Sequence, residues 1–132
     1  SAHPIGAAAG VANLQLVDDL GLIDNARENG AYLNAALQEA FHGHKYVAEV
    51  RGEGLMAAVE FAASTSPLAL FDPALKIGPA IVAAMAKRDV IARAMPQGDI
   101  VGFAPPLCIT QSEIDHVIAV TKDAVHEVTS TL

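Results

Sequence analysis

The sequence predicts an α+β fold in which a small, mostly antiparallel sheet has helices packed on one side. Apolar residues recur with helical spacing in residues 22–41 and again after residue 110. Through residues 55–61, inward and outward positions alternate as in a half-buried strand, with Leu55, Ala57, Val59 and Phe61 on one side and Met56, Ala58 and Glu60 on the other. The turn-forming sequence G-E-G precedes this segment. The chain has 132 residues, 52% of them hydrophobic and 17% charged, which suits one domain with a real core.

Four helices are expected. The first spans residues 4–19, begins with Pro4 and contains the small-residue run 6–10, which would let another element approach closely. Residues 77–88 form a third helix, and the last begins at Thr110, where Thr110 and Glu113 predict a capping box. The expected inward residues are Leu22, Ala26, Leu33, Leu37 and Phe41 in the second helix, Ile77, Ile81, Ala84 and Met85 in the third, and Ile114, Val117, Ile118, Thr121, Val125 and Val128 in the last. Asn25 is expected on the solvent side of the second helix.

Four short strands complete the prediction. Residues 47–51 and 55–61 read as a hairpin, and residues 62–76 as a loop. Residues 90–93 and 100–103 read as two further strands joined by a loop at 95–99. Residues 104–107 should be extended, because Pro105 disfavours the helical region for the residue before it.

The composition excludes several classes of function. A net charge of −7 argues against binding to nucleic acid or to an anionic membrane, both of which favour basic surfaces. No apolar run reaches the roughly 18 residues of a membrane-spanning helix. The single cysteine, Cys108, cannot form a disulfide within the chain, fits a cytoplasmic setting and is expected to be a small apolar core residue.

No self-contained catalytic motif is present. His42 and His44 are close together, but no third ligand stands at metal-binding spacing, so no metal site is predicted. A nucleophile elbow and a glycine-rich phosphate loop are both missing. On these grounds a non-catalytic α+β binding or dimerisation module remains an alternative.

Four motifs occur in a fixed order along the chain. They are S-A-H-P at residues 1–4, V-R-G-E-G-L-M at 50–56, an arginine-bearing strand at Arg93, and A-P-P-L with a following threonine at 104–110. Together they resemble the C-terminal third of class III aminotransferases of the ω-transaminase type, and the resemblance covers nearly the whole chain. It implies that residues 1–132 are the C-terminal domain of a fold-type I enzyme.

The resemblance implies pyridoxal 5'-phosphate as the cofactor of a homodimeric parent enzyme. The large cofactor-binding domain, with the lysine that forms the Schiff base, is expected upstream of Ser1, and no catalytic or cofactor-binding residue is assigned within the chain. The chain alone is therefore expected to be inactive and not to bind the cofactor specifically. The implied reaction moves an amino group from an amine or ω-amino acid to a keto acid such as pyruvate. An aminomutase or a decarboxylase on the same scaffold stays open.

One substrate-binding residue follows from the resemblance. In ω-transaminase-like members, an arginine at the place of Arg93 grips the substrate carboxylate, which a guanidinium can do through two parallel hydrogen bonds. Gly102 stands directly before the F-A-P-P-L run, where ornithine-type members have an arginine, and the lack of that arginine favours the amine or ω-amino-acid branch. Arg51, in the V-R-G-E-G-L-M turn, is expected to be structural.

Overall fold

The computed structural model describes residues 3–132, so Ser1 and Ala2 of the S-A-H-P motif lie outside the described residues. The elements are the helices α1 (Pro4–Asp19), α2 (Leu22–Phe41), α3 (Ile77–Ala86) and α4 (Gln111–Thr129), a 3₁₀ turn (Pro73–Leu75), and the strands β1 (Val47–Glu53), β2 (Met56–Phe61), β3 (Ser64–Thr65), β4 (Leu68–Ala69), β5 (Arg93–Ala94) and β6 (Asp99–Phe103).

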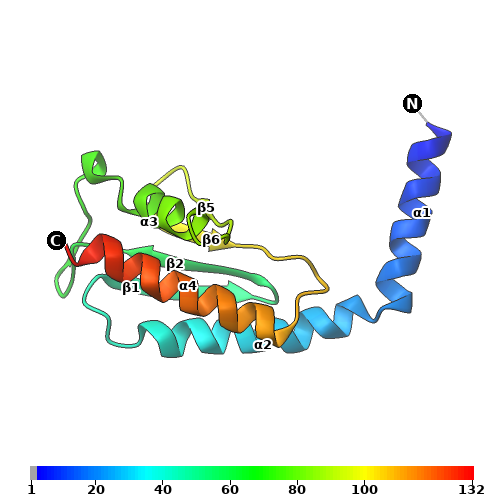
Figure 1. Ribbon diagram of the computed structural model, residues 1–132, viewed down its shortest axis with the longest axis horizontal. Coiled ribbons are helices and arrows are strands. Elements are labelled where there is room, and N and C mark those ends of the chain that lie inside the picture. The colour runs from blue at the N-terminus through cyan, green and yellow to red at the C-terminus, as the bar shows by residue number, and fades with distance from the viewer. Residues whose placement is uncertain (1–2) are drawn as a thin grey trace.

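The predicted α+β architecture is confirmed (Figure 1). One sheet has the strand order β1-β2-β6-β5, with every neighbouring pair antiparallel. Helices α2 and α3 pack on this sheet, and α4 packs beside both helices. Val59, Phe61 and Val101 point toward the helices and are fully buried, so the core lies between the sheet and the helix layer.

The helix faces follow the prediction most closely in α3, where all four expected inward residues are buried. In α2, Asn29 and Gly30 are buried, whereas Leu22 and Ala26 are only partly covered. In α4, Ile114, Thr121 and Val125 are buried as expected, whereas Val117, Ile118 and Val128 are only half-buried. Val120 and Ala124 join the buried face, because α4 contacts both α2 and α3. Both hydrogen bonds of the predicted capping box between Thr110 and Glu113 are present. The Thr110 backbone N–H and hydroxyl both donate to the Glu113 carboxylate, and these two bonds lower the pKa of that carboxyl.

The strand predictions need corrections at their ends. The strand expected at residues 90–93 is instead β5, at Arg93–Ala94. The ladder between β5 and β6 ends at the Arg93–Gly102 pair, and at the far end of the expected strand Val90 would have to pair with Pro105, which has no backbone N–H to donate. The loop at 62–76 contains the β3–β4 hairpin and a 3₁₀ turn.

Cys108 is exposed, so its assignment to the core is wrong. The residue follows two prolines in the turn that leads into α4, and its neighbour Ile109 takes the inward position with 6% of its surface exposed. A turn places adjacent residues in different directions, and only one of the two can face the core.

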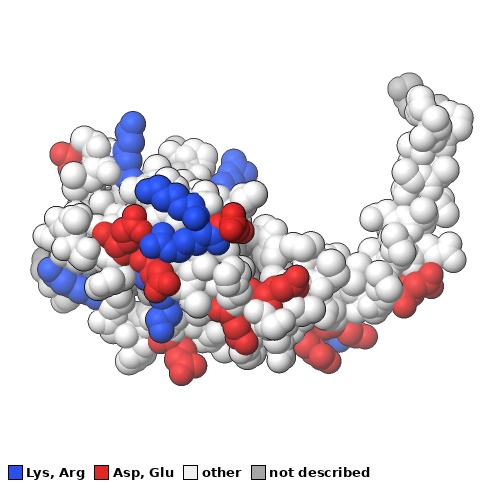
Figure 2. Space-filling view, in the orientation of Figure 1, with Lys and Arg blue, Asp and Glu red and all other residues white. Residues whose placement is uncertain are grey.

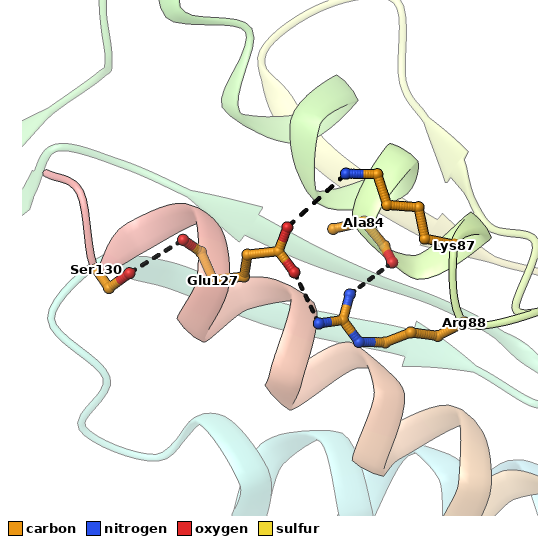
Figure 3. Close-up of polar contacts among 5 residues, drawn as sticks. All are labelled: Ala84, Lys87, Arg88, Glu127 and Ser130. Atoms are coloured by element: carbon orange, nitrogen blue, oxygen red, sulfur yellow. Dashed lines mark hydrogen bonds and ion pairs between the residues drawn. The ribbon is translucent and has the colours of Figure 1, made fainter.

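An ion-pair cluster joins the C-terminal ends of α3 and α4 (Figure 3). Arg88 Nη2 lies 2.7 Å from Glu127 Oε2, and Lys87 Nζ lies 4.0 Å from Glu127 Oε1. The hydrogen bond from Arg88 lowers the pKa of Glu127 below its usual range. Arg88 also donates to the Ala84 carbonyl at 2.9 Å, which satisfies an end carbonyl of α3.

The turn between β1 and β2 packs directly onto α2. Asn34 Nδ2 donates to the carbonyls of Gly30, at 2.8 Å, and of Gly54, at 2.9 Å. Gly54 has a positive φ of 53° and Gly30 lies against its backbone, where a Cβ on Gly30 would stand 2.3 Å from the Gly54 carbonyl carbon. Of the two glycines in the V-R-G-E-G-L-M motif, Gly54 is favoured by its positive φ, and Gly52 by the Asn34 side chain and the Met56 carbonyl that a Cβ would meet.

Helix α1 projects away from the rest of the molecule (Figure 1). None of its residues is buried, and Ile5, Val11 and Leu14 are each at least 65% exposed. Residues 4–17 carry no charged side chain, and Figure 2 shows the arm white on the side in view. The close partner expected for the small-residue run 6–10 is not found among residues 3–132. Across the same residues, no helix is long and apolar enough to span a membrane.

The contact between Gly30 and Gly54 predicts that Gly30→Ala destabilises the chain. The added methyl group meets backbone rather than a movable side chain, so we expect a loss of about 2 kcal/mol in the free energy of unfolding, measured by urea denaturation. Gly10→Ala is the matched control, because a Cβ at Gly10 meets nothing within 4 Å. Equal stability of the two variants would contradict the proposed packing of the turn.

The exposed apolar arm predicts that the isolated chain associates with itself in solution. Light scattering should give a mass above the 13.7 kDa of the monomer at high concentration. The double variant Val11→Glu and Leu14→Glu should return the mass to that of the monomer. Gln15→Glu, which adds charge to the same helix at a polar position, serves as the control and should still associate. A monomeric parent chain at high concentration rules the prediction out.

Candidate functional site

The side of the sheet opposite the helices, here called the open face, carries the only predicted substrate-binding residue. Because side chains alternate along a strand, the residues between the buried ones point to this side. Met56 on β2 is 67% exposed, although its neighbours Leu55 and Ala57 are buried. The open face is formed by Glu49, Arg51, Met56, Ala58, Glu60, Arg93, Met95, Ile100 and Gly102.

The strand register places two arginines in one row across the open face. Arg51 pairs with Ala58, Ala58 pairs with Gly102, and Gly102 pairs with Arg93. Directly paired residues point to the same side of an antiparallel sheet. Three strand spacings separate the two ends, or about 14 Å between the arginine backbones. The row therefore has a guanidinium at each end and two small residues between them.

Arg51 is held by two carboxylates. Its Nη1 lies 2.8 Å from Glu49 Oε2 and 2.6 Å from Glu60 Oε2. The hydrogen bond to Glu60 is the largest of the effects that raise the pKa of Arg51, so the guanidinium stays charged and its charge is compensated locally. The bond to Glu60 joins β1 to β2, which agrees with the structural role expected for Arg51.

Arg93 has no such partner. The side chain is exposed on the edge strand β5, and within residues 3–132 no carboxylate lies within 4.0 Å of its guanidinium. Its neighbour in the row, Gly102, has no side chain that could restrict it. An uncompensated guanidinium on an open face is able to bind an external carboxylate, which is the chemistry expected of Arg93.

Met95, at a position predicted to lie in a loop, belongs to the open face. Its backbone N–H donates to the Ile100 carbonyl at 2.9 Å, which continues the β5–β6 ladder by one residue. A Cβ built on Gly102 would lie 3.2 Å from Met95 Sδ, so the thioether lies over the place that a side chain at 102 would occupy. The spacing of two residues from Arg93 was the signal that could have placed Met95 on the same face.

Two asparagines of α2 hold the segment that follows β6. Asn29 Nδ2 donates to the Ile109 carbonyl at 2.7 Å, and Asn25 Nδ2 donates to the Leu107 carbonyl at 2.6 Å. Asn29 is itself buried, and Asn25 is half-buried rather than on the solvent side as expected. Through these bonds α2 anchors the A-P-P-L segment, whose orientation the two prolines alone do not determine.

The described residues outside the open face provide few groups suited to catalysis or to ligand binding. A cavity of about 650 Å³ lies between residues 89–91, the A-P-P-L segment and the start of α4; its lining is mostly apolar and does not include Arg93. His44 packs edge-on against Phe41, and burial lowers the pKa of its imidazole. No group of three or more His, Cys, Asp or Glu side chains in residues 3–132 is arranged to hold a metal ion.

The lysines do not fit a pyridoxal phosphate site. Lys45 donates to the Tyr46 hydroxyl at 2.8 Å, and Lys87 faces Glu127. Lys76 and Lys122, like the other two, are exposed, so none is desolvated in the way that makes a lysine amine a ready nucleophile. A cofactor held by a covalent bond to lysine therefore finds no prepared site among the described residues.

Comparisons with known proteins agree on one family. The model of the aminotransferase class-III family matches residues 1–125. The chain is 51% identical, over its whole length, to diaminobutyrate–2-oxoglutarate transaminase from Halomonas elongata, and covers 28% of that relative.

Solved structures give the same result. One from a study of directed evolution of transaminases by ancestral reconstruction matches with a TM-score of 0.97 and 51% identity, over 98% of this chain and 28% of that one. A thermostable (S)-enantioselective ω-transaminase from Thermomicrobium roseum matches with a TM-score of 0.88 and 36% identity, over 96% of this chain and 28% of that one. The chain thus spans less than a third of the length of these relatives.

The exposed lysines predict that the isolated chain does not bind pyridoxal phosphate at one specific site. After mixing and borohydride reduction, mass spectrometry should find adducts spread over several lysines, increasing without saturation as the cofactor concentration rises. Lys122→Arg should lower the total only in proportion to the lysine removed. A saturable adduct confined to a single lysine would show that this prediction is wrong.

Proposed function

The chain belongs to the class-III aminotransferases, and from this premise we propose that it is the C-terminal domain of a longer pyridoxal-phosphate-dependent transaminase. The reaction proposed for the whole enzyme moves an amino group from an amine or ω-amino acid to a keto acid such as pyruvate. The name of the Halomonas elongata relative, a diaminobutyrate–2-oxoglutarate transaminase, adds 2-oxoglutarate to the candidate acceptors.

The observation that carries the proposal is the state of Arg93. It is exposed, lacks an ion pair within residues 3–132, and stands opposite a glycine on the open face. We assign it to the substrate carboxylate, which it grips with two parallel N–H···O bonds. Arg51, on the same face, is unsuited to this role because Glu49 and Glu60 already neutralise it.

The position of Arg93 also fits an enzyme that handles two kinds of substrate. The strand β5 has only two residues and lies at the edge of the sheet, so the arginine side chain is free to turn away when the substrate carries an uncharged group. A keto acid in one half-reaction and an amine in the other can then use the same space.

The remaining chemistry is assigned to parts of the enzyme outside this chain. Pyridoxal phosphate, when bound, supplies the electron sink that makes transfer of the amino group feasible. The described residues do not fit that group, so we place its binding residues in the larger part of the relatives' length that this chain does not cover. A homodimer is proposed for the whole enzyme, and the isolated chain is expected to be inactive.

The test is transaminase activity of the full-length protein that contains this chain, with pyruvate and 2-oxoglutarate as acceptors and a panel of amines and ω-amino acids as donors. Arg93→Ala removes a charge-assisted pair of hydrogen bonds, so the KM for the keto acid should rise by about 10- to 100-fold. The half-reaction with an uncharged amine should change less than twofold. Arg93→Lys keeps the positive charge but loses the two parallel N–H donors, so its KM for the keto acid should lie between those of the parent and of Arg93→Ala.

Arg27→Ala is the matched control, because Arg27 is an exposed arginine paired only with Asp24 on the surface of α2. It should leave both half-reactions unchanged. An active enzyme whose keto-acid KM is the same with and without the Arg93 guanidinium would remove Arg93 from the substrate site. A full-length protein that transfers no amino group from any donor in the panel would refute the transaminase assignment itself.

A further inference from the structure

We propose that Met95 is a specificity-determining residue, and that its thioether is the movable wall of the space beside the Arg93 guanidinium. The inference rests on the proposed role of Arg93. It adds that Met95 determines the size of the group that the site accepts beside the carboxylate bound by Arg93.

The backbone sets Met95 beside Arg93 on the open face. The two residues are separated by one position on the same extended segment, so their side chains leave the sheet on the same side. The bond from the Met95 N–H to the Ile100 carbonyl, 2.9 Å, keeps residue 95 in the ladder. Met95 is 40% exposed, so it borders the space outside the sheet rather than filling the core.

Gly102 provides the place that the thioether occupies. A Cβ at 102 would lie 3.2 Å from Met95 Sδ and 3.7 Å from the Arg93 carbonyl oxygen. The φ of Gly102 is not in the left-handed region, and its nearest neighbour is the end of a flexible side chain, so neither backbone strain nor rigid packing requires glycine here. Because Gly102 has no side chain, the sheet surface opposite Arg93 is bare at this position, and the Met95 thioether covers part of it.

A methionine side chain suits a position that has to change conformation when the substrate changes. Its side chain is unbranched and its thioether is polarizable, so it changes rotamer at low cost and packs against groups of different shape. When Arg93 binds a carboxylate, the thioether can stay over Gly102 and leave room for a small neighbouring group such as the methyl of pyruvate. A larger uncharged group requires the thioether to leave that position.

Two changes test the wall in the full-length enzyme, with pyruvate and the bulkier 3-methyl-2-oxobutanoate as the acceptors. Met95→Ala should raise kcat/KM for 3-methyl-2-oxobutanoate relative to pyruvate by about tenfold, because loss of Cγ, Sδ and Cε makes room for the two extra methyl carbons of the bulkier acceptor. Met95→Leu, of similar volume, should keep the parent ratio.

Gly102→Val should displace the thioether toward Arg93 and raise the KM for pyruvate by about tenfold, with kcat for an uncharged amine donor within twofold. Adding Met95→Ala to Gly102→Val should bring the pyruvate KM back to within threefold of the parent, since the two side chains compete for one space. A loss of packing alone would not produce this rescue. Gly102→Ala, a milder change, should show a smaller effect in the same direction if the valine variant fails to fold.

Ala119→Val is the control, because Ala119 is exposed on α4, in the helix layer on the other side of the sheet from the open face. It should change the pyruvate KM less than threefold. An unchanged substrate ratio in Met95→Ala, or no rescue in the double variant, overturns this inference while leaving the role of Arg93 intact. If Arg93→Ala itself leaves the pyruvate KM unchanged, both the assignment of Arg93 and this inference are overturned.

Discussion

The pairing of β2 with β6 is the interaction on which the rest of the molecule depends. Its register, with Val59 opposite Val101 and Ala58 opposite Gly102, decides which side of the sheet every later residue faces. A slip of one residue would turn the buried valines toward solvent, so burial of one face makes the register strongly specific. The start of β6 also fixes α3, because Asp99 Oδ1 accepts a hydrogen bond from the Gly78 N–H at 2.8 Å.

The same register explains why two arginines on one face have different roles. Glu49 and Glu60 lie within 2.8 Å of the Arg51 guanidinium, and this exposed network consolidates the β1–β2 pair. Arg93 lies at the opposite edge, beyond Ala58 and Gly102, and no carboxylate of residues 3–132 reaches it. A guanidinium with unused donors on an open surface gains most from an external carboxylate, because no internal pair has to be broken first.

The helices, which pack on the other side of the sheet, fix the positions of the strands that form the open face. Contact of Gly30 with the Gly54 backbone brings α2 against the β1–β2 turn, and the Asn29 amide holds the segment after β6. Helix α1, in contrast, contributes nothing to the core within residues 3–132 and presents an uncharged apolar surface. An isolated 16-residue helix is only marginally stable in water, so α1 is the element that depends most on a partner.

The sequence alone determined the fold class, the four helices, the capping box at Thr110 and the family, because these depend on local periodicity, on turn chemistry and on motif order. It also singled out Arg93, through the resemblance. Only the tertiary structure decided that Arg51 is neutralised by Glu60, nine residues away on the neighbouring strand, that Met95 covers Gly102, and that Cys108 faces solvent beside the buried Ile109. Each of these facts depends on strand register or on a turn's direction, which are set by contacts between residues distant in the chain and which no local pattern encodes.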